Sequence, residues 1–148
     1  MTHQSLKCHK AAILLGGHSS RMGGQPKFLL KDGKGQSYLK RQIKALEKAD
    51  RIYLSAADAA QLALIQNVYK DKDCYGLIDV VKDCGPLGGL YTVLQQLKDE
   101  DEWIFVTACD VPELTESMVG SLIQMSVDAY EQGYDCMVYQ DSRGRIHP

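Results

Sequence analysis

Two hydrophobic periods alternate along this chain, and each change of period marks the boundary of an expected element. Short, strongly apolar runs are typical of strands buried in a sheet. Such runs occur at Lys10–Leu15, Arg51–Ser55, Gly76–Val81, Glu102–Ala108 and Tyr134–Tyr139. Phe28–Leu30 is a further, short extended piece. The pattern therefore predicts five strands separated by segments of a different character.

The segments between these runs carry apolar residues at helical spacing. Ser37, Asp58 and Thr115 stand where the side chain of an N-cap is expected. Helices are expected from these caps to about Ala49, Tyr69 and Gln132, and over Gly88–Leu97. In the last helix, the residues expected to face the core are Met118, Leu122, Met125 and Ala129. Strands alternating with helices predict an α/β fold, a Rossmann-like three-layer sandwich with a mostly parallel sheet.

Ligands of such sheets bind outside the carboxyl ends of the strands. This rule brings the loops after the first four strands to one crevice. Those loops contain Gly16–Lys27, Ala56–Asp58, Asp83–Gly89 and Asp110–Pro112. The residues with candidate chemistry therefore converge on one edge of the predicted sheet.

Composition restricts the class of protein. The chain has 148 residues, of which 45% are hydrophobic, so we expect a single domain over residues 1–148. A net charge of −2 gives no support to a nucleic-acid or membrane-surface partner. No apolar run approaches a membrane span, and Lys10–Leu15 is too short for a signal peptide, so a cytoplasmic protein is expected. Five cysteines without a C-x-x-C pair indicate reduced thiols.

Charge is divided unevenly between the two halves. Residues 1–74 hold 13 Lys+Arg and 6 Asp+Glu, whereas residues 75–148 hold 4 and 13. A basic half for phosphates and an acidic half for metal would have this pattern. A solvated surface explains most of these charges equally well.

The first strand runs into a glycine-rich loop that carries Arg21 and Lys27. Glycines let the backbone approach a ligand and direct N–H groups at it, and the two cations add charge where phosphates would lie. The loop is not a P-loop, because Phe28 follows the lysine where Ser or Thr is required. It also lacks the G-x-G-x-x-G of a dinucleotide fold. We therefore expect a triphosphate-binding loop of another kind.

The pattern L-x-G-G-x-S-x-R-M-G-x-x-x-K at Leu14–Lys27 resembles the signature of nucleotidyltransferases that build NDP-sugars and NDP-cofactors. With Gly-Gly after the strand, it is most similar to the molybdenum cofactor guanylyltransferases. Cys109–Pro112 resembles the C-D-x-P motif of that family, and Asp83–Gly89 resembles its D-x(n)-G-P-L-x-G loop. The resemblance implies a sheet of the nucleotide-diphospho-sugar transferase type.

The resemblance also implies a reaction, in which molybdenum-molybdopterin attacks the α-phosphate of GTP and pyrophosphate leaves. The implied partners are GTP, the molybdopterin cofactor and other molybdenum-cofactor proteins. Arg21 would hold pyrophosphate, Lys27 would lie near the α-phosphate, and Asp110 would hold Mg²⁺ as the metal ligand. The remaining implied nucleotide-binding residues are Leu14, Leu15, Gly16, Gly17, Asp83, Gly85, Pro86 and Leu87.

Two positions depart from the family pattern. Pro26 stands where the family usually carries Asp before the lysine, and Ala57 stands where the guanylyltransferases tend to carry an Asn that contacts the nucleotide. Three alternatives therefore stay open: a CTP-using transferase, a sugar-phosphate transferase and a non-catalytic nucleotide-binding module. In the family, the equivalent of His147-Pro148 leads into a strand that completes the sheet. We accordingly expect the C-terminal strands to lie beyond Pro148.

Overall fold

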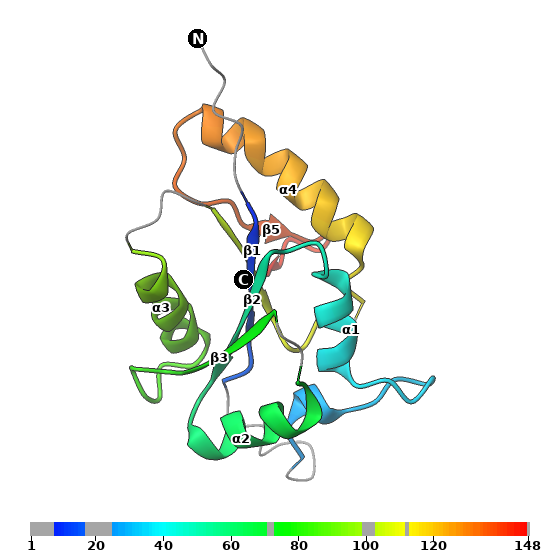
Figure 1. The fold of residues 1–148 in the computed structure, drawn as a ribbon. Coiled ribbons are helices and arrows are strands. Elements are labelled where there is room, and N and C mark those ends of the chain that lie inside the picture. Colours follow the sequence, from blue (N-terminus) through cyan, green and yellow to red (C-terminus); the bar gives the residue numbers. More distant parts are fainter. Residues whose placement is uncertain (1–7, 17–24, 71–72, 99–102, 112, 148) are drawn as a thin grey trace.

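The computed structural model describes residues 8–16, 25–70, 73–98, 103–111 and 113–147. Their centre is a four-stranded parallel sheet with the order β3-β2-β1-β4 (Figure 1). The strands are β1 (Lys10–Leu14), β2 (Arg51–Ala56), β3 (Cys74–Ile78) and β4 (Ile104–Ala108). The parallel α/β fold predicted from the sequence is confirmed.

The described residues also form four α-helices and one 3-10 turn. They are η1 (Lys27–Leu29), α1 (Tyr38–Ala45), α2 (Ala59–Val68), α3 (Pro86–Gln96) and α4 (Glu116–Glu131). The three expected N-caps are confirmed, because the side chains of Ser37, Asp58 and Thr115 accept hydrogen bonds from backbone N–H groups three residues later. Phe28–Leu30, expected as extended, instead overlaps the 3-10 turn.

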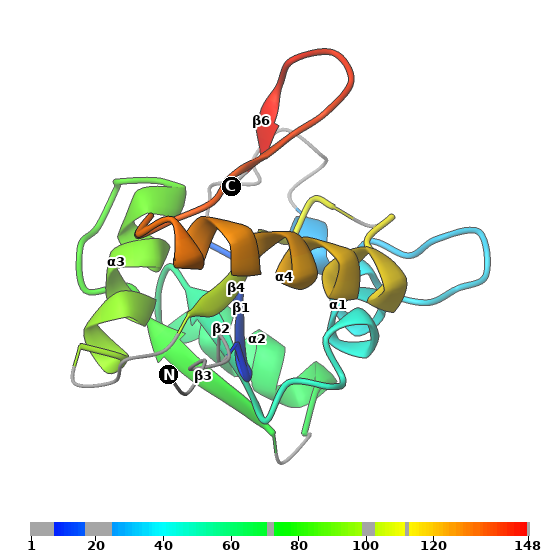
Figure 2. The same ribbon diagram turned by 90° about the horizontal axis from the view of Figure 1, so that it is seen from above.

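Side chains of β1 alternate between two cores, as the period of a strand requires. Ala11, Ile13 and Leu15 belong to a core that α1, α2, η1 and the start of α4 cover. Ala12 and Leu14 belong to a second core, which α3 covers through Val93 and Leu97. The views in Figures 1 and 2 show α3 on one side of the sheet and α1 and α4 on the other. The three-layer arrangement is therefore confirmed, and β1 is its buried centre.

Strand β3 lies earlier in the chain than the predicted Gly76–Val81. Its pairing with β2 ends at Ala56 and Ile78, because β2 ends there. Val80 and Val81 are left 64% and 41% exposed in the loop that follows. The shift moves Asp79 from the expected strand interior to the carboxyl edge of the sheet.

The predicted strand at Tyr134–Tyr139 was wrong over most of its length. Only Tyr139–Gln140 (β5) is extended and paired, and it pairs antiparallel with Ile146–His147 (β6) in a separate hairpin (Figure 2). The carboxylate of Asp141 accepts hydrogen bonds from the backbone N–H groups of Arg143 and Arg145. This local turn chemistry closes the hairpin away from the main sheet.

The expected inward face of α4 was wrong at Met118 and Met125, whereas Leu122 and Ala129 are partly buried. Met118 and Met125 are 41% and 61% exposed, whereas Val119 and Ser126 are buried. Leu114 is buried just before the helix, and Val119 and Ile123 contact the same core. Among the described residues, no helix is both long and apolar enough to cross a bilayer.

Candidate functional site

The loops after β1 and β4 leave the sheet side by side, because these strands are parallel neighbours. The ladder continues one step past the strands, since the Cys109 N–H donates to the Leu14 carbonyl at 3.1 Å. Gly16 and Asp110 each follow this last shared hydrogen bond by two residues or fewer along their own chain segments. The glycine loop and the acid therefore start from one edge, as the sequence predicted.

Lys27 reaches the same edge from η1. Phe28 is 1% exposed and anchors this short turn in the core, so the neighbouring lysine is fixed near the strand ends. The Lys27 Nζ lies 3.7 Å from Asp110 Oδ2. The two side chains are 45% and 57% exposed, which leaves both charges accessible to a ligand. The structure therefore brings together two of the three predicted catalytic residues.

Cys109 precedes Asp110 but is mostly withdrawn from solvent. Burial, with the charge of Asp110 as a second cause, raises the pKa of its thiol to about 11. The thiol is therefore neutral near pH 7, and thiolates are the reactive and metal-binding form of cysteine. This environment does not favour a nucleophilic or ligating role for Cys109.

Asp79 lies beside the candidate site, and the sequence analysis did not identify it. It is 5% exposed, and one carboxylate oxygen accepts a hydrogen bond from the hydroxyl of buried Ser55. The other oxygen lies against the glycine loop, because a Cβ built on Gly16 would be 2.7 Å from Asp79 Oδ2. Burial raises the pKa of Asp79, opposed by the Ser55 hydrogen bond and the charge of Lys82. An earlier end of β3 would have identified Asp79 as the acid at the strand terminus.

The Gly85–Gly89 loop forms the start of α3. Gly85 is the N-cap, with φ 55° and ψ −141°, a backbone conformation that L side chains rarely adopt, and Pro86 begins the helix. Gly89 packs on β2, since a Cβ there would lie 2.6 Å from Ser55 Oγ. Leu87 is 71% exposed beside this turn. The helix start therefore packs closely on β2 at Gly89.

The loop after β2 is held by side chains from two other segments. Lys82 Nζ donates to the Ala57 carbonyl at 2.5 Å. The Gln61 amide accepts from the Ala57 N–H at 2.7 Å and donates to the Leu15 carbonyl at 3.2 Å. Gln61 thus joins the loops after β1 and β2, and the backbone of Ala57 is held from both sides.

The other predicted site residues differ in how the structure places them. Gly17, Arg21 and Pro112 lie outside the described residues. Asp83 is exposed at a left-handed position with φ 57°. Leu14 and Leu15 are 4% and 2% exposed, so their side chains belong to the core and only backbone groups could face a ligand.

The exposed carboxylate of Asp110 suits a magnesium ion that is bound together with a nucleotide. Mg²⁺ usually keeps several waters and takes one or two carboxylates plus substrate phosphates. Asp110 provides one exposed carboxylate at the ligand edge. Within the described residues, no group of three or more His, Cys, Asp or Glu side chains could hold a metal ion. Phosphate oxygens would thus supply ligands that the described residues do not supply.

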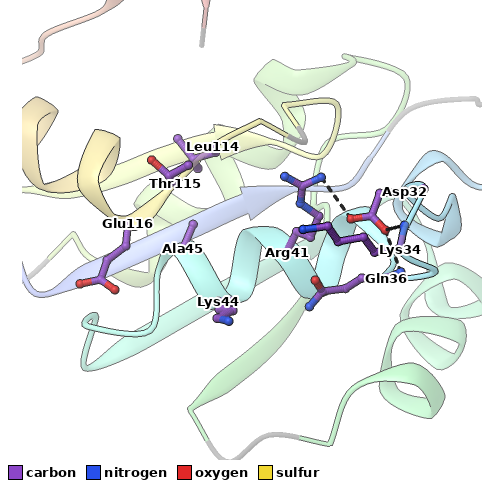
Figure 3. A pocket seen from close by; sticks show the side chains of 10 residues that line it. Asp32, Lys34, Gln36, Arg41, Lys44, Ala45, Leu114, Thr115 and Glu116 are labelled. Carbon is purple, nitrogen blue, oxygen red and sulfur yellow. Dashed lines mark hydrogen bonds and ion pairs between the residues drawn. The ribbon is translucent and has the colours of Figure 1, made fainter.

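A pocket of about 500 Å³ lies beside this edge, between α1 and the segment before α4 (Figure 3). Arg41 and Asp32 form an ion pair of 3.2 Å in its wall. The Lys34 and Gln36 N–H groups also donate to Asp32, and these contacts lower the pKa of that carboxyl. These charges stabilise the 32–36 turn, and the pocket contains none of the predicted site residues.

A parallel sheet with Gly16, a lysine and an acid at its carboxyl edge is typical of α/β proteins whose ligands bind outside the strand ends. The model of the MobA-like NTP transferase domain matches residues 11–148, and the chain belongs to this family. The protein is therefore a nucleotidyltransferase that uses a nucleoside triphosphate.

A solved structure gives independent support for the fold. The crystal structure of Rv0371c from Mycobacterium tuberculosis H37Rv is similar, with a TM-score of 0.71 and 18% sequence identity. The similarity covers 97% of this chain and 70% of that one. At this identity it shows a common fold alone.

Proposed function

We propose that this protein transfers GMP from GTP to molybdenum-molybdopterin and releases pyrophosphate. The observation that carries the proposal is the approach of Lys27 Nζ to Asp110 Oδ2, 3.7 Å apart at the carboxyl edge of β1 and β4. A cation and an anion that are both half-exposed can separate to bind a phosphate and its metal ion. Membership in the MobA-like family supports nucleotidyl transfer at this edge.

In this mechanism, a terminal phosphate oxygen of the acceptor forms a bond to the α-phosphorus of GTP. The bond from that phosphorus to the bridging oxygen of the leaving pyrophosphate breaks. Lys27 offsets negative charge at the α-phosphate, and Arg21 binds the departing pyrophosphate. Positioning and charge neutralisation supply most of the catalysis in such a step. Mg²⁺, held by Asp110, would neutralise phosphate charge when bound.

The backbone is proposed to bind the rest of the nucleotide. N–H groups at Gly16 and Gly17 would cradle the triphosphate, above backbone supplied by Leu14 and Leu15. The turn at Gly85, Pro86 and Leu87, with Asp83, would hold the nucleoside. Asp79 would support the backbone at Gly16, because its carboxylate fills the space beside that residue.

A CTP-using transferase is the second candidate, and Ala57 keeps it open. The guanylyltransferases tend to carry an Asn that contacts the nucleotide at this position, whereas the Ala57 side chain has no polar atom. The Ala57 backbone is also occupied, since it bonds to Gln61 and Lys82. Base selection at this loop would have to come from other groups.

Single-turnover assays with molybdenum-molybdopterin test the proposal. Pyrophosphate release and the dinucleotide product are measured with GTP, CTP, ATP and UTP in parallel. Guanine dinucleotide formed at the same rate as pyrophosphate supports the proposal. Product with CTP alone would establish the second candidate instead, and absence of product with every nucleotide would refute both.

A further inference from the structure

Gln42 is a polar side chain in the buried face of α1. It is 0% exposed, and the other buried residues of this helix are Leu39, Ile43 and Ala45. An amide in such surroundings costs free energy unless its polar atoms are paired. The pairing of this amide therefore indicates what the residue contributes.

Both hydrogens of the Gln42 amide are directed at the loop after β4. Nε2 donates to the Ala108 carbonyl at 2.6 Å and to the Val111 carbonyl at 3.1 Å. These two carbonyls stand on either side of Cys109-Asp110 in the chain. One side chain thus fixes both ends of the segment that presents the Asp110 carboxylate.

The acceptor atom of the same amide gains nothing from this arrangement. Oε1 is buried and has no hydrogen-bond partner among the described residues. A flipped amide would set Oε1 against two carbonyl oxygens, so the two accepted hydrogens determine its orientation. The free-energy cost of the buried, unpaired Oε1 offsets much of the stabilisation from the two hydrogen bonds. The main effect of Gln42 is therefore on the conformation of the loop.

We propose that Gln42 is a positioning residue, which holds Asp110 in place and thereby sets the affinity of the nucleotide complex for its divalent cation. This inference rests on the proposed role of Asp110 as the metal ligand. Gln42 itself touches no ligand. Partners that orient a ligating carboxylate typically change metal affinity by 10–100-fold when they are removed.

Gln61 provides an internal comparison, since its amide joins the loops after β1 and β2 and does not contact the loop of Asp110. Replacement of Gln61 by Met is expected to weaken nucleotide binding even without metal. Replacement of Gln42 is expected to weaken binding of the divalent cation and to leave metal-free nucleotide binding unchanged. Gln61 would therefore support nucleotide binding, and Gln42 would support cation binding.

The test measures Mn²⁺ binding by electron paramagnetic resonance in the presence of GTP, and metal-free GTP binding by calorimetry. The variants are Gln42→Met, which keeps the length of the side chain, and Gln42→Glu, which keeps its shape but lacks the Nε2 donors. Ser126→Ala is the matched control. Ser126 is 5% exposed, and its hydroxyl donates a 2.7 Å hydrogen bond to the Ile123 carbonyl within α4. The substitution removes this buried hydrogen bond without removing a contact to the loop of Asp110.

Both Gln42 variants are expected to bind Mn²⁺ about 10-fold more weakly or worse, with metal-free GTP affinity within about twofold of wild type. Ser126→Ala is expected to leave both affinities unchanged. Wild-type Mn²⁺ affinity in Gln42→Met, when Asp110→Asn loses it, would overturn this inference alone. Unchanged Mn²⁺ affinity in Asp110→Asn would overturn the metal role of Asp110 in the proposed function as well.

Discussion

Lys27 and Asp110 lie 3.7 Å apart, Nζ to Oδ2, although they come from opposite halves of the chain. Each is held in place by a buried contact. The ion pair itself contributes little stability, because both of its charges are exposed. Phe28 anchors the lysine, and Gln42 binds the carbonyls on both sides of the acid. The positions of these two side chains therefore depend on buried contacts of the fold.

Replacement of Lys27 by Ala is expected to lower turnover by at least ~10²-fold, the loss typical when a group that stabilises transition-state charge is removed. The measurement is the rate of pyrophosphate release at saturating nucleotide. Lys98→Met is the control, because it removes an exposed cation just after α3, at the opposite edge of the sheet. Turnover of Lys27→Ala within a few-fold of wild type would contradict the role of this lysine.

Replacement of Gly16 by Ala is expected to displace the glycine loop, because the added Cβ would lie 2.7 Å from Asp79 Oδ2. Nucleotide affinity measured by calorimetry should fall. Asp79→Ala removes the colliding atom, so the loss caused by Gly16→Ala should be smaller in that background. Gly120→Ala is the control, since nothing lies within 4 Å of the added Cβ. Equal losses in both backgrounds would exclude the collision as the cause.

A side chain at Gly85 is expected to lower the free energy of unfolding. With φ 55° and ψ −141°, Gly85→Ala should destabilise the fold by roughly 1–3 kcal/mol. The free energy of unfolding in urea measures the effect. Gly33→Ala serves as the control, because Gly33 has an ordinary φ and open space around it. A similar stability change in the two variants would mean that Gly85 is not strained in this way.

The stability of the fold should depend on pH through Asp79. Its pKa in the folded protein is raised by burial, so the stabilising contribution of its protonated form is complete below the pKa of an unfolded Asp. That contribution is lost as pH rises through the folded pKa. Asp79→Asn, which cannot ionise, should therefore gain stability relative to wild type between pH 4 and pH 7. Urea unfolding at both pH values measures this, and a constant difference would show that the pKa of Asp79 is the same in the folded and the unfolded protein.

The strand at Lys10–Leu15, the caps and the convergence of loops could be predicted from the sequence, because each depends on local periodicity and on the parallel topology. The end of β3 could not, since it depends on where β2 ends at Ala56. The placement of Asp79 failed for the same reason. The phase of α4 was misjudged because apolar residues such as Met118 and Met125 stand on its exposed face, so periodicity alone does not identify the buried side. The burial of Gln42 could not be predicted from the sequence, because glutamine is usually a surface residue.

Calorimetric titration with GTP, CTP, ATP and UTP, each with and without Mg²⁺, tests the central claim most directly. We expect GTP to bind in preference to the other three, with an affinity that rises when Mg²⁺ is present and does not rise in Asp110→Asn. Binding that ignores Mg²⁺, or a preference for another base, would contradict a guanylyltransferase site built on Lys27 and Asp110.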